Sequence, residues 1–404
     1  MTSRSDVLVV GAGPAGIAAA LTAQRAGLGV RVIDKATFPR DKCCGDGLTT
    51  GALRLLDQLG LRPETVASWK TCRDVTLRSP SGRVVNLQLP EDGQFAAIAT
   101  RLDLDAALVA HARAEGVEIR EGVAFTKIEQ PRDARRHNDD ADHRVSTSEG
   151  DFTARVVVAA DGMWSPIRKA LQPDRSPYLG EWHALRQYAT NVTGSASERL
   201  FVWFEPELLP GYAWSFPLTD GRANLGFGIL RGASQKVGDM KQLWSDVLAR
   251  DHVRAALGDG AVIDDKVSAW PIPARVTSAT LNIGSVLFVG DAACATDVLT
   301  GEGIGQALLS GMLAGDAATQ ANPGRTYERA MRREFFADHR LSNVLGRVLG
   351  NETLARGALR IIDNGEWRKD KFVRWMFEDE PRASAFTPRR WHRGFLSSRG
   401  AYAK

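Results

Sequence analysis

The stretch DVLVVGAGPAGIAAALTAQRAGLGVRVID, residues 6–34, decides the fold of this 404-residue chain. Its first five residues form an apolar run that is typical of a buried strand, and a glycine-rich turn and an Ala/Leu-rich helix to about Ala26 follow. Gly27 is placed to end that helix, and Val30 to Ile33 form the next apolar run. The stretch therefore predicts a strand–helix–strand unit.

The turn in this unit carries the pattern G-x-G-x-x-G at Gly11, Gly13 and Gly16. Because the pattern follows a predicted strand, opens a helix and precedes Asp34 at the end of the next strand, it indicates dinucleotide binding. Gly11 permits the tight turn, Gly13 lets the backbone approach a pyrophosphate, and Gly16 lets helix and strand pack closely. Free N–H groups at the helix start favour phosphates, and the carboxylate of Asp34 suits a ribose diol. The pattern by itself does not separate NAD from FAD.

Composition narrows the class of protein. Hydrophobic residues make up 44% and charged residues 25%, as in an ordinary soluble enzyme. The 52 basic and 48 acidic residues give a net charge of only +4, which provides no electrostatic case for a nucleic-acid partner. The scattered histidines form no motif for a metal site. Two of the four cysteines are adjacent, which fits neither a disulfide framework nor a zinc ligand set and favours a reducing compartment: Cys43, Cys44, Cys72 and Cys294.

The apolar stretch near the N-terminus contains three glycines and a proline, so we interpret it neither as a signal peptide nor as a membrane span. We expect a cytoplasmic protein, with attachment to a membrane surface left open.

Further along the chain, the pattern predicts a helix over 102–115 and strands at 117–127, 144–147 and 155–160. The charged run at 131–143 between two of these strands is typical of a solvated loop.

From about residue 181 to 230, short alternating segments interrupted by prolines predict an antiparallel sheet and a second domain. Ser285 to Val289 is again a buried-strand run, and an Ala/Leu/Gly-rich helix starts at about Gly303. The chain after residue 325 is predicted to be helical. It ends in a basic tail with Arg382, Arg389, Arg390, His392, Arg393, Arg399 and Lys404.

Two strand ends carry a carboxylate beside a glycine, at Asp161-Gly162 and at Gly290-Asp291. A carboxylate in these places suits ribose or ribityl hydroxyls, and the helix start after the second pair suits the electron-rich pyrimidine end of a flavin.

Together, these elements resemble the FAD-binding fold of p-hydroxybenzoate hydroxylase-like monooxygenases, flavin-dependent halogenases and geranylgeranyl reductases, over residues 6 to about 320. FPRDKCCGDGL, residues 38–48, is similar to the PR-x-K-x-C-G-x-G segment of geranylgeranyl reductases and menaquinone side-chain reductases. GYAWSFP, residues 211–217, is similar to their Y-x-W-x-F-P motif, and TGEGIG, residues 300–305, to their helix start. The chain thus resembles the geranylgeranyl reductase family.

The chain also departs from the family pattern. It has Asp297-Val298 where relatives commonly have Asn/Asp-Pro, and Leu218 where archaeal relatives often have lysine. Because of these departures, the sequence leaves open the geometry of one loop near the flavin. It also leaves open the particular substrate.

The resemblance implies an α/β fold: a Rossmann-type FAD-binding domain with an inserted antiparallel β-sheet substrate domain and a helical C-terminal region. The corresponding boundaries are 1–70, 98–172 and 278–330 for the FAD-binding domain, 71–97 and 173–277 for the substrate domain, and 331–404 for the helical region with its basic tail.

The resemblance also assigns the cofactor site. Arg101 is expected beside the FAD pyrophosphate, Asp161-Gly162 between FAD and the nicotinamide approach, and Gly290-Asp291 at the ribityl chain. The expected cofactor-binding residues are Gly11, Gly13, Pro14, Ala15, Gly16, Asp34, Lys35, Arg40, Cys44, Gly45, Arg101, Asp161, Gly162, Gly290, Asp291, Gly301, Gly303 and Ile304.

Four residues are catalytic candidates: Cys44, Asp46, Tyr212 and Trp214. Tyr212, Trp214 and Phe216 alternate along a predicted strand and so share one face, where they form either an aromatic wall for an apolar chain or a core stripe. Cys44 either shapes the cavity, donates a proton or is a small packed residue, and Asp46 is either a proton source or part of a tight turn.

The resemblance implies an FAD-dependent oxidoreductase that reduces carbon–carbon double bonds of an isoprenoid by hydride transfer from reduced flavin. The alternatives are a monooxygenase of the same fold, with a halogenase disfavoured because Y-A-W-S-F-P replaces W-x-W-x-I-P, and a non-catalytic electron-transfer flavoprotein. We expect NAD(P)H, ferredoxin or a flavin reductase as electron donor and an apolar or lipid substrate, and we leave peripheral membrane contact open.

Overall fold

The computed structural model describes residues 3–129, 142–172, 174, 178–232, 235–391 and 400–401. The expected charged loop lies outside these residues except for Asp142 and His143, as does the basic tail from 392 to 399 and from 402 onwards. No helix within the described ranges is long and apolar enough to cross a membrane.

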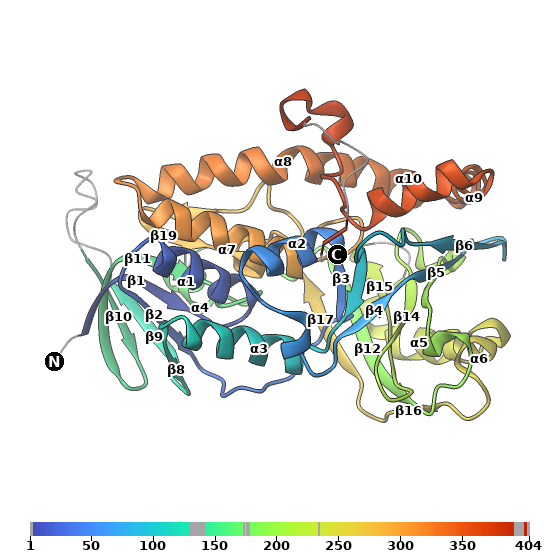
Figure 1. Cartoon of the computed structure of the whole chain (residues 1–404), viewed down its shortest axis with the longest axis horizontal. Helices are drawn as coiled ribbons and strands as arrows, with labels where there is room; N and C mark the ends of the chain where they lie inside the picture. Colours follow the sequence, from blue (N-terminus) through green and yellow to red (C-terminus); the bar gives the residue numbers. More distant parts are fainter. Residues whose placement is uncertain are drawn as a thin grey trace.

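The predicted strand–helix–strand unit forms the centre of a largely parallel sheet (Figure 1). Strand β1 (Ser3–Val10) pairs in parallel with β2 (Val30–Asp34) on one side and with β11 (Gly150–Ala159) on the other. Its apolar residues are buried because both faces of the sheet are covered. The order is β18–β19–β11–β1–β2–β8, with β8 (Glu118–Glu121), β18 (Asn282–Ile283) and β19 (Val286–Phe288).

One predicted strand is wrong. The segment expected as a single strand over 117–127 is broken at Gly122, whose φ of 76° turns the chain. The part before the break, β8, pairs in parallel with β2, and β9 (Phe125–Glu129) after it pairs in antiparallel fashion with β10 (His143–Thr147).

Several helices pack on this sheet and on one another (Figure 1). Helix α3 (Arg101–Ala114) confirms the predicted helix within one residue, and its Leu104, Leu108 and Ala112 are buried as the spacing predicted. Helix α1 (Pro14–Arg25) packs against α7 (Ile304–Ala318), and α4 (Pro166–Leu171) follows β11.

The contact between α1 and α7 depends on glycine. A Cβ on Gly311 would lie 2.1 Å from the carbonyl oxygen of Ala15, and a Cβ on Gly315 would lie 2.7 Å from that of Ala19. The two backbones therefore touch directly, which places the start of α7 beside the glycine-rich turn.

An antiparallel second sheet was predicted, but the sheet is mixed. Strand β13 pairs with β5 in parallel, whereas its other partner, β14, and the remaining strands pair in antiparallel fashion. The order is β16–β12–β15–β14–β13–β5–β6, and β17 also pairs with β12. The bounds are β5 (Asp74–Arg78), β6 (Val84–Gln88), β12 (Trp182–Thr190), β13 (Leu200–Trp203), β14 (Ala213–Pro217), β15 (Ala223–Leu230), β16 (Val262–Ile263) and β17 (Ser268–Ile272). Helices α5 (Met240–Leu248) and α6 (Asp251–Leu257) follow β15 in the chain.

A small sheet and the C-terminal helices complete the fold. Strands β3 (Gly47–Thr49), β7 (Ala96–Ile98) and β4 (Lys70–Cys72) form the small sheet, and α2 (Thr50–Gln58) continues from β3. Helix α8 (Pro323–Leu349), orange in Figure 1, runs over the parallel sheet, and α9 (Glu352–Asp363) and α10 (Glu366–Met376) lie beyond it towards β6. Arg382, which we assigned to a basic tail, is 3% exposed, because a cluster of carboxylates surrounds it.

We predict that Gly311→Ala lowers the free energy of unfolding by about 1–3 kcal/mol, because the added methyl overlaps the Ala15 carbonyl oxygen and must push α7 away from α1. The measurement is thermal unfolding followed by circular dichroism. Gly346→Ala on α8 is the matched control, since its Cβ would meet nothing within 4 Å, and we expect it to be neutral or slightly stabilising. Equal midpoints for Gly311→Ala and wild type would contradict the close contact.

Candidate functional site

The glycine-rich turn presents a backbone surface to two arginines. Gly11 has a φ of 110°, and a Cβ there would lie 2.2 Å from the carbonyl oxygen of Ala160, so no other residue fits. A Cβ on Gly13 would lie 3.5 Å from Nη2 of Arg40 and 4.0 Å from Nη2 of Arg101. Two guanidinium groups therefore stand in front of the N-terminus of α1.

One buried carboxylate holds both arginines. Arg101 donates two hydrogen bonds of 2.7 Å to Asp105, whose side chain is fully buried, and Nη1 of Arg40 lies 3.0 Å from the same carboxylate. Nη1 of Arg40 is buried without a hydrogen-bond partner. Two cations, an unused donor and a helix start fit the pyrophosphate of a dinucleotide.

Asp34 lies at the end of β2, where the sequence placed it. Its Oδ2 accepts a hydrogen bond from the N–H of Ala12 at 2.7 Å, and its Oδ1 accepts one from the N–H of Ala36 at 2.8 Å. These bonds fix the carboxylate against the glycine-rich turn and leave lone pairs for a ribose diol. The neighbouring Lys35 is exposed, and its cofactor role stays a prediction.

Asp291 is brought to the same edge of the sheet by the 3-10 turn at Gly290–Ala293. Its Oδ2 accepts a hydrogen bond of 3.0 Å from Nζ of Lys42, and its Oδ1 lies 3.5 Å from the hydroxyl of Thr296. Burial acts to raise the pKa of Asp291, but the charges of Lys42 and Arg101 outweigh it and lower that pKa. Asp291 is therefore an anionic hydrogen-bond acceptor, which suits the hydroxyl groups of a polyhydroxyl chain.

The glycines around Asp291 allow close approaches. A Cβ on Gly290, whose φ is 57°, would lie 3.1 Å from the Cβ of Ala15, which is itself buried behind the glycine-rich turn. Gly301 has a φ of 71°, Gly303 precedes Ile304 at the start of α7, and Pro14 begins α1. These positions lie at or just before the starts of the two helices.

Asp161 has one oxygen engaged and one free. Its Oδ2 accepts a hydrogen bond of 3.0 Å from the N–H of Ile167 in α4, whereas its Oδ1 is buried without a partner. Burial raises the pKa of Asp161 to about 6. Gly162 has a φ of 80° and open space where a Cβ would lie. The unpaired oxygen and the open space leave room for a polar ligand group at this strand end.

The segment 39–47 is tied to the second sheet by polar contacts. Arg186 on β12 is 2% exposed and places Nη2 2.9 Å from both carboxylate oxygens of Asp41. Asn224 on β15 donates a hydrogen bond of 2.9 Å to the carbonyl oxygen of Cys44. The segment thus bridges the two sheets.

Asp46 is the centre of these contacts. It is fully buried with a φ of 62°, its Oδ2 accepts hydrogen bonds from Asn224 at 2.7 Å and the Tyr188 hydroxyl at 2.8 Å, and its Oδ1 accepts one from the N–H of Arg101 at 3.2 Å. Burial raises the pKa of Asp46 to about 6, although the hydrogen bonds from Asn224 and Tyr188 act to lower it. The geometry gives Asp46 a positioning role, and a proton-donating role stays a prediction.

The two adjacent cysteines are both free and have raised pKa values. Burial and the charge of Asp46 raise the pKa of Cys44 to about 12, and burial also raises the pKa of Cys43. At neutral pH, Cys44 is therefore an uncharged thiol.

The prediction that Tyr212, Trp214 and Phe216 share one face, as an aromatic row, is confirmed. The ring centroids of Tyr212 and Trp214 lie 6.1 Å apart, and those of Trp214 and Phe216 lie 6.2 Å apart. A Cβ on Gly45 would lie 3.5 Å from the Phe216 ring and 3.6 Å from Nε1 of Trp214, so the row packs on the segment that contains Cys44. Whether these side chains take part in catalysis stays a prediction.

Several polar residues of this site were missed by the sequence analysis. One of them is Asn224, which also accepts a hydrogen bond of 3.0 Å from Nε1 of Trp214. Its polar amide within the apolar run ANLGFGIL could have marked it as a functional residue. Glu302 stands between two glycines at a helix start, and Lys42 lies in the FPRDKCCGDGL segment, so both had a recognisable context. Nothing in the sequence linked Tyr188 to Asp46, more than a hundred positions earlier.

Comparison with known proteins agrees with this geometry. Residues 4–316 match the family described as "FAD binding domain". The chain is 33% identical over 343 residues to the menaquinone reductase of Mycobacterium tuberculosis, covering 77% of this chain and 76% of that protein. It is 31% identical over 327 residues to digeranylgeranylglycerophospholipid reductase 2 of Methanopyrus kandleri, covering 78% and 77%.

Solved structures share the fold. A geranylgeranyl bacteriochlorophyll reductase-like protein from Thermoplasma acidophilum superposes with a TM-score of 0.77 at 20% identity, over 97% of this chain and 100% of that one. A probable FAD-dependent monooxygenase from Pseudomonas aeruginosa superposes with a TM-score of 0.65 at 20% identity, over 89% and 100%. The fold is thus common to proteins with different described reactions.

We predict that Arg40→Ala weakens FAD binding by about 10- to 100-fold, the value of one charge-assisted hydrogen bond. Asp105 keeps its two hydrogen bonds from Arg101, so the variant leaves no buried charge unpaired. The measurement is titration of apoprotein with FAD, with Arg62→Ala at an exposed position as the control. An unchanged dissociation constant for Arg40→Ala would show that this arginine does not bind FAD.

Proposed function

We propose that this protein reduces carbon–carbon double bonds in an isoprenoid chain. The chain belongs to the family of FAD-binding proteins that includes menaquinone reductase and the digeranylgeranylglycerophospholipid reductases. The coarser statement, that it is an FAD-dependent oxidoreductase, follows from the family itself. The substrate class is the proposal.

The observation that carries the proposal is the contact between the aromatic row and the Cys44 segment. Trp214 and Phe216 pack against Gly45, on the segment whose Lys42 reaches Asp291, and Tyr212 extends the row beyond Trp214. A row of rings offers contact area to a long apolar chain without demanding a polar group from it.

The chain's own residues supply orientation and a dry surface. Reduced FAD, when bound, would supply the hydride. Arg40 and Arg101 would hold its pyrophosphate, and Asp291 its hydroxyls, because these groups lie along one sheet edge. The uncharged thiol of Cys44 adds no ion to the apolar surface, which favours an alkene over a charged substrate.

The electron donor and the location are further parts of the proposal. NAD(P)H bound transiently, a ferredoxin or a flavin reductase would reduce the FAD. An isoprenoid lipid or quinone resides in a membrane, and α9 and α10 expose apolar side chains that suit its surface, among them Leu354, Ile361 and Trp367.

A monooxygenase is the second candidate, because a probable FAD-dependent monooxygenase shares the fold. A non-catalytic electron-transfer protein is the third. One experiment separates the three. The purified holoprotein is reduced without oxygen and mixed in a stopped-flow instrument with a prenyl quinone that carries an unsaturated side chain, or with air-saturated buffer.

Flavin reoxidation by the quinone without oxygen, with a side chain heavier by two hydrogen atoms, is the expected result. An oxygen-dependent flavin transient with an unchanged side chain would favour the monooxygenase. A reduced flavin that the quinone does not reoxidise, but that an added redox protein does, would favour electron transfer.

We predict that Phe216→Ala raises the KM for a prenyl substrate by about 10- to 100-fold, because an apolar chain loses contact with one ring of the row. FAD affinity should stay within about threefold, since the Phe216 ring packs on Trp214 and on Gly45 and Gly47. Steady-state kinetics measure the effect, and Phe386→Ala, at a side chain that is 75% exposed, is the control. Equal KM values for Phe216→Ala and wild type would show that the aromatic row does not bind the substrate.

A further inference from the structure

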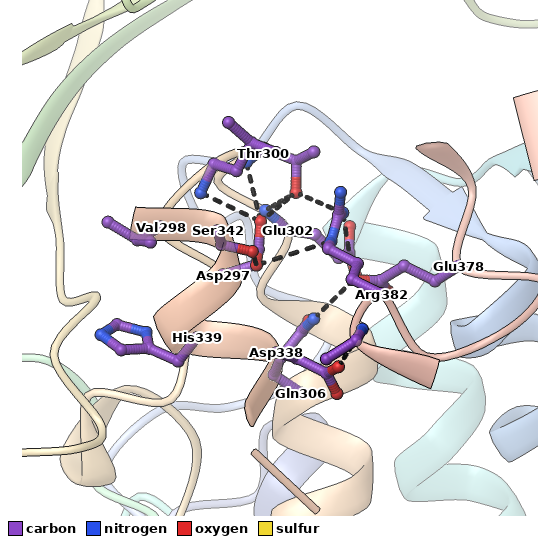
Figure 2. A network of polar contacts seen from close by, with 12 residues as sticks. Asp297, Val298, Thr300, Glu302, Gln306, Asp338, His339, Ser342, Glu378 and Arg382 are labelled. Atoms are coloured by element: carbon purple, nitrogen blue, oxygen red, sulfur yellow. Dashed lines mark hydrogen bonds and ion pairs between the residues drawn. The ribbon is translucent and has the colours of Figure 1, made fainter. Parts of the chain in front are cut away.

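The loop 297–303, which precedes α7, is closed around the side chain of Asp297 (Figure 2). One carboxylate oxygen, Oδ1, accepts hydrogen bonds from the N–H groups of Leu299 and Thr300 at 3.0 and 2.8 Å, and from the Thr300 hydroxyl at 2.9 Å. Val298 does not fix its own φ as a proline would, so the backbone depends on these contacts. The shape of the loop therefore follows the position of the Asp297 carboxylate.

The other oxygen of Asp297 is held by the C-terminal part of the chain. This Oδ2 accepts a hydrogen bond of 2.8 Å from the hydroxyl of Ser342 on α8 and lies 3.6 Å from Nε of Arg382. Nη2 of Arg382 donates a hydrogen bond of 3.2 Å to the Thr300 hydroxyl and another of 3.2 Å to Oε1 of Glu378. Figure 2 shows Arg382 between Glu378 and the loop. One guanidinium group thus contacts both the carboxylate and the hydroxyl that shape the loop.

Arg382 is in turn fixed by its surroundings. Its side chain is almost completely buried, and its partner Glu378 is tied to two other elements. Glu378 accepts hydrogen bonds of 3.0 Å from the amide of Gln306 on α7 and of 3.3 Å from the hydroxyl of Thr49, the N-cap of α2. The segment 377–382 therefore has a defined place against α2 and α7, and Arg382 passes that place on to the loop.

The loop also contacts the expected cofactor edge. The hydroxyl of Thr296, the residue before the loop, donates a hydrogen bond of 3.5 Å to Oδ1 of Asp291. A Cβ on Gly303 would lie 3.3 Å from that same hydroxyl. Gly301 and Gly303 are expected cofactor-binding residues, and Ile304 begins the helix whose start suits the pyrimidine end of a flavin. A shift of the loop would therefore move groups that are expected to contact FAD.

The second sheet holds the opposite side of the loop. The Tyr212 hydroxyl donates a hydrogen bond to the carbonyl oxygen of Thr300, and Nε1 of Trp182 on β12 donates one of 3.0 Å to that of Val298. The loop is thus tied to the aromatic row, to the cofactor edge and to the C-terminal segment. Arg382 is the charged group among these ties.

We propose that Arg382 is a positioning residue for the bound flavin. It holds the carboxylate of Asp297 and the hydroxyl of Thr300 in one place, and the loop then fixes the start of α7 against the cofactor. The C-terminal segment would thereby complete a cofactor site built by residues 4–316, the part of the chain that matches the FAD-binding family. The inference requires FAD at this edge but no particular substrate.

The first test compares two substitutions of Arg382 in the holoprotein. Arg382→Lys keeps a positive charge beside Asp297 and Glu378, but one ammonium group cannot repeat the contacts of a planar guanidinium. Its unfolding midpoint should fall less than that of Arg382→Gln, which leaves two buried carboxylates without their cation. In Arg382→Lys we nevertheless expect a changed visible circular dichroism of the flavin and an FAD affinity about 10-fold weaker. A wild-type flavin spectrum and FAD affinity in Arg382→Lys would overturn the proposal.

The second test uses Thr300→Val, which removes a hydroxyl but no charge, so the fold should persist even where an Arg382 variant fails to fold. The variant loses the hydrogen bond from Arg382 and keeps the backbone N–H that Asp297 accepts. We expect the same change in the flavin spectrum and an FAD affinity about threefold weaker. A wild-type spectrum and affinity in Thr300→Val would contradict the proposal.

The double variant tests whether the two residues act through one contact. If they do, Arg382→Lys with Thr300→Val should weaken FAD binding by about 10-fold, rather than by the roughly 30-fold that independent effects would give. Independent effects would show that Arg382 does not act through this loop.

Asp338→Asn on α8 is the matched control. Asp338 binds the same C-terminal segment, because its carboxylate accepts the N–H of Ala383 at 2.7 Å and pairs with Arg390 at 2.8 Å. Among the described residues, no hydrogen bond or ion pair joins Asp338 to the loop 297–303. The variant should lower the unfolding midpoint, leave the flavin spectrum unchanged and keep FAD affinity within about threefold of wild type.

An Arg382→Lys spectrum and affinity no different from those of Asp338→Asn would reduce Arg382 to a structural residue and overturn the proposal. None of these measurements uses a prenyl substrate. A wild-type protein that reduces no prenyl quinone would therefore contradict the proposed function alone, and the role of Arg382 would be decided by the flavin measurements.

Discussion

The direct backbone contact between α1 and α7 is the constraint on which the rest of the site depends. With a Cβ on Gly311 only 2.1 Å from the Ala15 carbonyl oxygen, any larger side chain would force the helices apart. Because they touch, the start of α7 and the Gly290-Asp291 turn lie beside the glycine-rich turn of α1. Motifs that lie far apart in the sequence thereby form one edge that fits FAD.

A second constraint couples that edge to the aromatic row. The segment 39–47 carries Lys42, which reaches Asp291, and Asp46, whose carboxylate is held by Asn224 and Tyr188 from the second sheet. A buried carboxylate without such donors would cost several kcal/mol, so these contacts are needed once Asp46 is buried. The distance from the cofactor edge to the aromatic row is therefore set by hydrogen bonds rather than by apolar packing alone.

The parts of the structure that follow from local patterns were predictable, and those that follow from distant pairing were not. The β1–α1–β2 unit and the shared face of Tyr212 and Trp214 depend on neighbouring residues, and both were predicted correctly. The parallel pairing of β13 with β5, the break at Gly122 and the burial of Arg382 depend on partners or turns that carry no periodic signal. Polar networks such as Asp46–Asn224 join residues 178 positions apart, so only the folded chain reveals them.

The most direct test of the account is a crystal structure of the reduced holoprotein with a prenyl quinone bound under anaerobic conditions. The account predicts that the prenyl chain lies along Tyr212, Trp214 and Phe216, with a double bond beside the flavin ring. A chain bound elsewhere, or a polar aromatic ring in that place, would contradict reduction of an isoprenoid at this site.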